Sequence, residues 1–135
     1  MKISILLPYK ENYSKNYAGA VSIFVNEINK TSKYKLSTKI FGNTNFKNYL
    51  SKNYINIPFK KKYFFSSSKI YVNNFIKLEK KRNSDIIEIH NRPSYLKYFD
   101  YFKKRIVFYF HNDPLKMTGS ISIQERIFIL NTCHK

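Results

Sequence analysis

The sequence of 135 residues has one cysteine, Cys133, and only three glycines. A single cysteine excludes an internal disulfide, and no second cysteine or suitably spaced histidine offers a zinc site. No apolar run approaches the roughly 20 residues that span a bilayer, so any membrane contact has to be peripheral. We therefore expect a reducing cytoplasmic location, with peripheral contact at the inner face of the membrane as its only membrane association.

Acidic residues are also scarce, since 25 basic residues face 8 acidic ones and the formal net charge is +17. Such an excess favours an anionic partner, either nucleic acid, a membrane surface or a phosphorylated substrate. However, only four of the basic residues are arginines, which argues against a specific nucleic-acid reader. The many Lys, Asn, Ile, Tyr and Phe residues are equally typical of a biased codon supply. The run Lys60–Lys62 fits a solvated loop or a site for a lipid headgroup.

Apolar residues make up 43% of the chain and aromatic residues 18%, which is enough for one compact domain. The apolar pattern predicts strands at 3–7, 34–41, 54–59, 86–90 and 106–110, and helices that begin near Gly19, Ser66, Tyr95 and Ser122. Strands that alternate with helices favour an α/β fold, a Rossmann-like doubly wound parallel sheet.

Three segments carry more detailed predictions. Residues 34–41 alternate in polarity, which predicts a half-exposed strand near a sheet edge. Residues 106–110 are the most apolar run, which predicts a buried strand. In the last helix, Ser122 and Glu125 have the spacing of a capping box, and an apolar stripe of Ile123, Ile127 and Leu130 is expected to pack on the core.

Ligands of open parallel sheets bind beyond the carboxyl ends of the strands. The loops 8–19, 90–93 and 111–114 follow predicted strands at that edge. His90 and His111 leave two of these strands at equivalent points, and each is followed by an asparagine. A lone histidine is more often structural, but a matched pair favours function, because neutral imidazole hydrogen-bonds hydroxyl groups and phosphate oxygens.

Each of the other residues at this edge has two possible roles. Arg92 offers a donor fork for a phosphate or carboxylate, or forms a salt bridge. Asp113 accepts from a ligand hydroxyl, or caps the following turn. Gly19 and Ala20 lie at a predicted helix N-terminus that favours a phosphate, or simply start the helix. A single glycine is far from a dinucleotide motif, and the absence of acidic residues after the first strand argues against a phosphoacceptor domain.

Several segments together resemble a known family. They are "ISILLPY" with "AGAVSIFVNEI" behind it, "DIIEIHNRPSYL", and "IVFYFHNDPLKMTGSISIQERIFILNTC". In this order they resemble the N-terminal half of the family 4 retaining glycosyltransferases, which have the two-domain GT-B fold. The resemblance implies transfer of a sugar from a nucleotide-sugar donor to a saccharide or lipid-linked acceptor, of the hexosyltransferase type used in polysaccharide biosynthesis. It implies no cofactor and no essential metal.

The resemblance also implies roles for individual residues. His111 would contact the transferred sugar as the catalytic residue, and Gly19 with Ala20 would approach the donor diphosphate. The acceptor side would comprise His90, Asn91, Arg92, Asn112 and Asp113. The family often has paired glycines where this chain has Gly19 and Ala20. The side chain of Ala20 leaves less room for a phosphate to approach the backbone.

The family's second half, which carries the donor site, has no counterpart in this sequence. We therefore expect residues 1–135 to form one acceptor-side domain that needs a separate donor-binding domain and is inactive alone. The alternative is a non-catalytic basic α/β module that binds nucleic acid or an anionic membrane surface.

Overall fold

The described residues form one sheet of five strands, all of them parallel, in the order β3-β2-β1-β4-β5. The structure is a computed structural model that describes residues 1–61, 63–100, 102 and 104–133. The strands are β1 (Ile3–Leu6), β2 (Thr38–Gly42), β3 (Tyr54–Asn56), β4 (Ile86–His90) and β5 (Arg105–Tyr109). The predicted Rossmann-like doubly wound α/β fold is confirmed.

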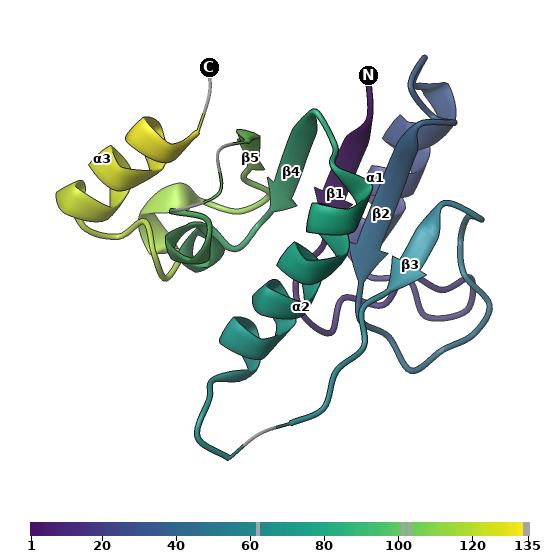
Figure 1. The fold of residues 1–135 in the computed structure, drawn as a ribbon, viewed down its shortest axis with the longest axis horizontal. Coiled ribbons are helices and arrows are strands. Elements are labelled where there is room, and N and C mark those ends of the chain that lie inside the picture. The colour runs from purple at the N-terminus through teal and green to yellow at the C-terminus, as the bar shows by residue number, and fades with distance from the viewer. Residues whose placement is uncertain (62, 101, 103, 134–135) are drawn as a thin grey trace.

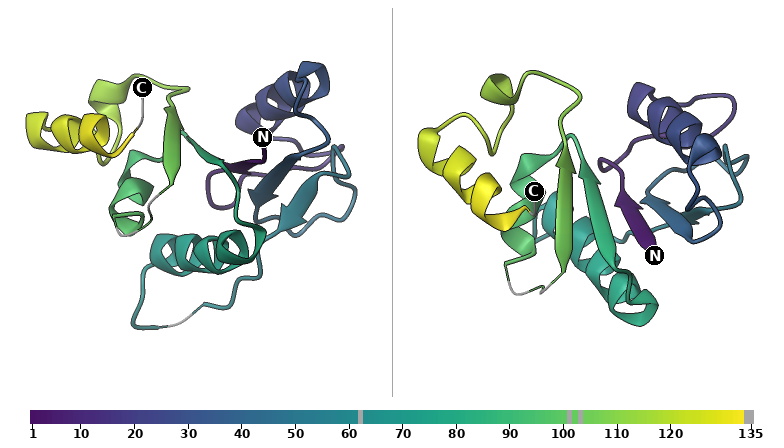
Figure 2. Two further views of the ribbon diagram at one scale, coloured as in Figure 1. Left: turned by 45° about the horizontal axis from the view of Figure 1, so that its top comes forward. Right: turned by 90° about the horizontal axis from the view of Figure 1, so that it is seen from above.

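Helices lie on both faces of the sheet (Figures 1 and 2). The α-helices are α1 (Ala20–Thr31), α2 (Ser67–Arg82) and α3 (Ile123–Thr132), and two short 3-10 helices are η1 (Pro93–Tyr98) and η2 (Pro114–Lys116). The chain winds outward from β1 to β3 and then crosses back to β4, so the winding direction changes between β1 and β4. No helix in the described part of the chain is long and apolar enough to cross a membrane.

Adjacent residues of β1 point to opposite faces, and each face has its own core. Ile5 packs under α1, whereas Leu6 packs under α2. The α1 core contains Ile5, Leu7, Tyr13, Val21, Val25, Ile40 and Tyr54. The larger core beneath α2, η1 and α3 includes Leu6, Phe41, Tyr71, Phe75, Ile87, Ile89, Tyr95, Leu96 and Ile106. The near-continuous apolar run of β1 therefore reflects burial on both sides.

The prediction for residues 34–41 is wrong in two respects. Residues 34–37 form a turn, in which the Thr38 N–H donates to the Tyr34 carbonyl at 3.0 Å, and the strand begins only at Thr38. Strand β2 lies between β3 and β1, with Ile40 and Phe41 buried on opposite faces. Leu36, in the turn, is 90% exposed. The apparent alternation combined a turn with a fully covered strand.

The prediction of a buried strand at 106–110 is also wrong, because β5 is an edge strand. Ile106 is buried on the α2 side, but Val107 and Tyr109 are 38% and 40% exposed on the other. Helix α1 packs mainly on β1 and β2 and reaches β5 through Phe24, whose ring lies 5.3 Å from that of Tyr109, so this face of β5 is only partly covered. An apolar run therefore predicts a strand, whereas its place in the sheet is decided by the order of the other strands.

The last two predicted helices differ from expectation in different ways. The segment that begins near Tyr95 forms the 3-10 helix η1, and residues 101 and 103 of its predicted stretch lie outside the described residues. In α3 the capping box is confirmed, with reciprocal bonds between Ser122 and Glu125. The predicted stripe is exposed by 51–64%, whereas Ile129 is buried. Helical spacing shows which residues share a face, but not which face is covered.

Candidate functional site

The two histidines that the sequence places at strand ends lie in contact. The β4–β5 register pairs His90 with Tyr109, so the loops after both strands start side by side. His90 Nδ1 lies 2.7 Å from His111 Nε2, which is hydrogen-bond distance. The prediction that the two imidazoles meet at the carboxyl edge of the sheet is confirmed.

A carboxylate lies on the other side of His90. Residues two apart on a strand point to the same face, so Glu88 and His90 both face α1. Glu88 Oε1 lies 2.5 Å from His90 Nε2, and His90 is 1% exposed. The sequence prediction missed Glu88, although its spacing from His90 within a strand was a readable sign.

Aromatic rings enclose the pair. Phe24 of α1 meets the His111 ring at right angles with 4.9 Å between ring centroids, and Tyr109 stacks on His90 at 5.3 Å. Burial lowers the pKa of His111, the neighbouring His90 lowers it further, and Glu88 acts in the opposite direction. The net pKa lies below the ordinary histidine value, so His111 is mainly neutral at pH 7 and one ring nitrogen can accept a hydrogen bond.

Asn91 holds the two strand ends together. It has a left-handed backbone, with φ of 54°, and its N–H donates to the Tyr109 carbonyl at 2.8 Å. Its side-chain oxygen accepts from the His111 N–H at 3.3 Å. Asparagine tolerates this backbone conformation better than most residues. The side chain therefore fixes the backbone of His111, and its predicted contact with a sugar stays a prediction.

A pocket of about 410 Å³ lies beside the histidines. It brings together four predicted ligand-binding residues, and its lining includes Asn91, Arg92, Ser94, Asn112, Asp113 and Lys116. The side chains of Arg92 and Asn112 are exposed. In the described part of the chain Arg92 makes no ion pair within 4 Å. The salt bridge suggested as its alternative role is therefore not formed with any described residue.

Asp113 has the second of its two predicted roles. Its Oδ1 accepts from the Leu115 N–H at 2.9 Å and so caps η2, while Oδ2 lies 3.8 Å from the Lys116 ammonium. Both groups are solvent-exposed, so the ion pair contributes little to stability. The carboxylate shapes the loop that lines the pocket, and binding of a ligand hydroxyl stays a prediction.

The N-terminus of α1, where Gly19 and Ala20 are predicted to meet a phosphate, already has an anion beside it. Glu11 Oε1 accepts from the Ser22 N–H at 3.1 Å, as the helix dipole favours. A Cβ atom on Gly19 would lie 2.0 Å from this oxygen, so glycine makes room for the carboxylate. A phosphate here would have to displace Glu11, a residue that the sequence prediction missed.

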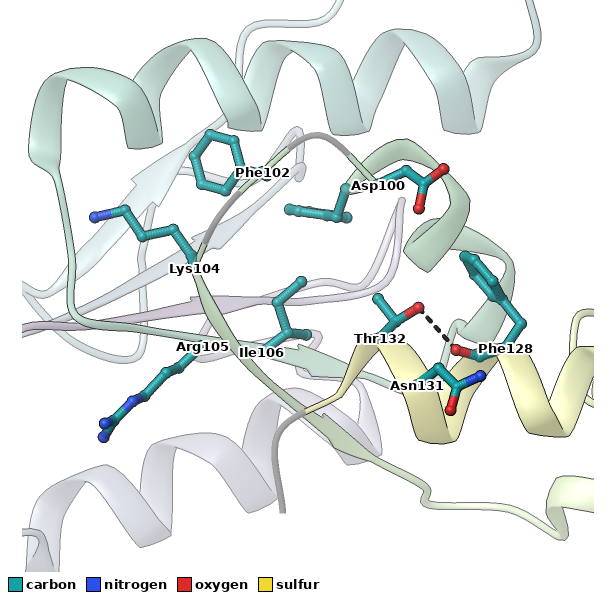
Figure 3. Close-up of a pocket in the computed structure, with 9 residues that line it drawn as sticks. Asp100, Phe102, Lys104, Arg105, Ile106, Phe128, Asn131 and Thr132 are labelled. Carbon is teal, nitrogen blue, oxygen red and sulfur yellow. Dashed lines mark hydrogen bonds between the residues drawn. The ribbon is translucent and has the colours of Figure 1, made fainter.

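Other hollows lie elsewhere on the described surface, and two of them adjoin strand ends. One of about 520 Å³ follows the ends of β1 and β2, with a lining that includes Tyr9, Lys10, Asn12, Thr44 and Asn45. The other, of about 610 Å³, lies at the start of β5 between Lys104, Arg105 and α3 (Figure 3). The Thr132 hydroxyl on its α3 side donates to the Phe128 carbonyl. Because this second hollow lies at the amino end of β5, it is separate from the histidine pair.

Among the described residues, no group of three or more His, Cys, Asp or Glu side chains is arranged to hold a metal ion. No protein-family model matches the sequence, and no curated protein matches it as a relative. A functional assignment therefore has to rest on the fold, the geometry of this edge and the sequence motifs.

Proposed function

We propose that the chain is the acceptor-side domain of a retaining glycosyltransferase, which transfers a sugar from a nucleotide-sugar donor to a saccharide or lipid-linked acceptor. It works together with a donor-binding domain. The observation that carries this proposal is the contact between His90 and His111 at the carboxyl edge of a parallel sheet. Ligands of this fold class bind at that edge, and the segments that resemble the glycosyltransferase family supply both histidines.

Each group has a role that fits its chemistry. Neutral His111 accepts a hydrogen bond from a hydroxyl of the transferred sugar, and is the catalytic residue of the proposal. Arg92 and Asn112, exposed in the adjacent pocket, donate to acceptor hydroxyl or phosphate oxygens. The donor diphosphate approaches the N-terminus of α1 if Glu11 swings away.

Sugar transfer is tested on the native gene product, isolated with any donor-binding partner and supplied with labelled nucleotide sugars. His111→Ala should lower the transfer rate by about 100-fold or more. Glu27→Gln, a change at an exposed glutamate of α1, is the matched control and should leave the rate unchanged. Absence of transfer from every nucleotide sugar, or full activity of His111→Ala, would contradict the proposal.

A second candidate function, binding to an anionic membrane surface, is favoured by the loop before α2. Tyr63 and Phe64 are 99% and 96% exposed, and Phe65 is 50% exposed. This loop reaches the lowest point of the view in Figure 1, on the side to which the strand arrows point. Consecutive aromatic side chains at a projecting tip suit the interface between lipid headgroups and acyl chains.

The charges around this tip fit the same partner. Segment 60–82 contains eight basic residues and one acidic residue, Glu79, whose side chain is buried. Each lysine near an anionic bilayer contributes about 1 kcal/mol to binding. Lys60, Lys69 and Lys77 line a hollow beside Phe65. Since the segment has a single arginine, Arg82, lipid headgroups fit it better than nucleic acid.

Sedimentation with vesicles tests this candidate. The protein should bind phosphatidylcholine vesicles that contain phosphatidylglycerol and not pure phosphatidylcholine, because the lysines need an anionic surface. Replacing both Tyr63 and Phe64 by serine should weaken binding by about tenfold or more. Leu36→Ser is the control, because Leu36 is 90% exposed in the turn at the opposite edge of the sheet. An equal effect of the control, or binding to nucleic acid alone, would refute membrane binding.

A further inference from the structure

Glu88, His90 and His111 form a linear chain of hydrogen-bonding groups. Glu88 Oε1 lies 2.5 Å from His90 Nε2, and His90 Nδ1 lies 2.7 Å from His111 Nε2. No hydrogen bond to His111 Nδ1 is formed by the described residues, so the chain ends at this nitrogen. The middle ring is secluded, since His90 is 1% exposed, while Glu88 and His111 at the two ends of the chain are each partly exposed.

The carboxylate determines where the protons of both rings lie. An ionised carboxylate only accepts hydrogen bonds, so His90 Nε2 has to carry a proton. Neutral His90 then has its lone pair on Nδ1 and accepts from His111 Nε2. Neutral His111 in turn has its lone pair on Nδ1. The reverse arrangement would place two lone pairs opposite each other at one of the two contacts.

We propose that Glu88 and His90 are positioning residues that fix the tautomer of His111, so that its Nδ1 presents a lone pair to a ligand hydroxyl, and that the three residues form a proton relay. The use of Nδ1 on a sugar hydroxyl rests on the proposed function. The positions of the protons do not.

A proton that reaches His111 Nδ1 makes that ring an imidazolium, whose Nε2 proton can pass to His90 Nδ1. His90 then carries both ring protons, and its positive charge lies beside the Glu88 carboxylate. His111 returns to a neutral ring with its proton on Nδ1. The same steps in reverse return the proton, so no other reactant is needed.

Glu88 is the charged group that the neighbouring elements bring to the pair. Strand β5 contributes Tyr109, and α1 contributes Phe24 to the two rings. The small cavity beside Glu88 and His90, about 60 Å³, has no other charged side chain in its lining. Its α1 wall includes Asn29, a buried amide, whereas the α1 charges Glu27 and Lys30 pair with each other at the surface. Removal of the Glu88 charge should therefore act directly on the histidines.

The test is nitrogen-15 NMR of the histidine rings in the whole chain, titrated with acid. In the wild type, both His90 and His111 should show a protonated Nε2 and an unprotonated Nδ1 at neutral pH. Glu88→Gln, which keeps the size of the side chain, should lower the pH at which the pair takes up its first proton by about one unit. Glu27→Gln is the matched control, and His134→Ala identifies the signals of the third histidine.

Circular dichroism and thermal unfolding of Glu88→Gln should match the wild type, which separates a change in proton position from a loss of structure. A protonated Nδ1 on His90 in the wild type would overturn the proposal. So would a titration that shifts no more in Glu88→Gln than in Glu27→Gln. If the relay is found and no sugar transfer occurs, the proposed function fails alone. If transfer occurs and the ring signals do not respond to Glu88, the relay fails alone.

Discussion

A carboxylate network lies at the amino ends of the strands, here the amino edge, and another lies at their carboxyl ends, the carboxyl edge. The two networks differ in the groups that bind the carboxylate. At the amino edge, Glu79 is fully buried and accepts from the Ser4 hydroxyl at 2.5 Å and the Ser84 N–H at 2.7 Å. Arg82 donates to the Ser4 oxygen at 3.0 Å. At the carboxyl edge, Glu88 faces two imidazoles in series.

The difference lies in the groups that surround each carboxylate. Glu79 accepts from hydroxyl and amide groups, and the Arg82 guanidinium joins the network through Ser4; none of these groups exchanges protons near pH 7. That network closes on backbone carbonyls, because Arg82 also donates to Ile3 and Ser37. The Glu88 network runs through two imidazole rings, which can both donate and accept a proton, and ends on the half-buried ring of His111. One network therefore holds strands together, whereas the other can move a proton.

Glu79→Ala should produce the largest effect on stability. It leaves the Ser84 N–H and the Ser4 hydroxyl buried without their acceptor, so the free energy of unfolding should fall by about 3 kcal/mol. Urea unfolding measures this change. Glu27→Ala, at an exposed glutamate, should leave the free energy of unfolding unchanged within error. A loss of less than about 1 kcal/mol in Glu79→Ala would show that the amino-edge network does not stabilise the fold.

Gly19→Ala should have a smaller effect and tests a third carboxylate, Glu11. The new Cβ would displace the Glu11 carboxylate from the N-terminus of α1, which should cost about 1 kcal/mol because the Ser22 N–H loses its acceptor. The backbone of Gly19, with φ of −75°, is open to alanine, so no strain adds to this cost.

Unfolding of Glu11→Ala and of the double variant checks the assignment. If both changes act through one contact, the double variant should lose no more than either single variant. Additive losses would contradict it and would show that the two changes do not act through the contact between Glu11 and the N-terminus of α1.

The sequence predicted that His90 and His111 lie at one edge because parallel strands end at a common edge. Their direct contact also requires β4 and β5 to be neighbours in the sheet, which is decided by the strand order. The contact between Glu88 and His90 could also have been predicted, because residues two apart on a strand point to the same face. It did not predict Glu11, since the path of the loop before α1 has no periodic pattern. The exposure of Tyr109 depends on which strand lies at the edge, and that is decided by contacts distant in sequence.

The smallest expected effect is a dependence of stability on pH that comes from His111. Its pKa in the folded protein lies below the ordinary histidine value of about 6.5, because burial and His90 disfavour the charged ring. Between these two pKa values the unfolded chain binds the proton and the folded chain does not, so acid favours unfolding. The contribution of His111 to stability is fully present above about pH 6.5 and is lost as the pH falls through the folded pKa.

Urea unfolding from about pH 5 to 8 should show this loss of stability in the wild type and a smaller loss in His111→Gln. Equal slopes in the two proteins would place the ring in water, and the carboxyl-edge network would then end at His90.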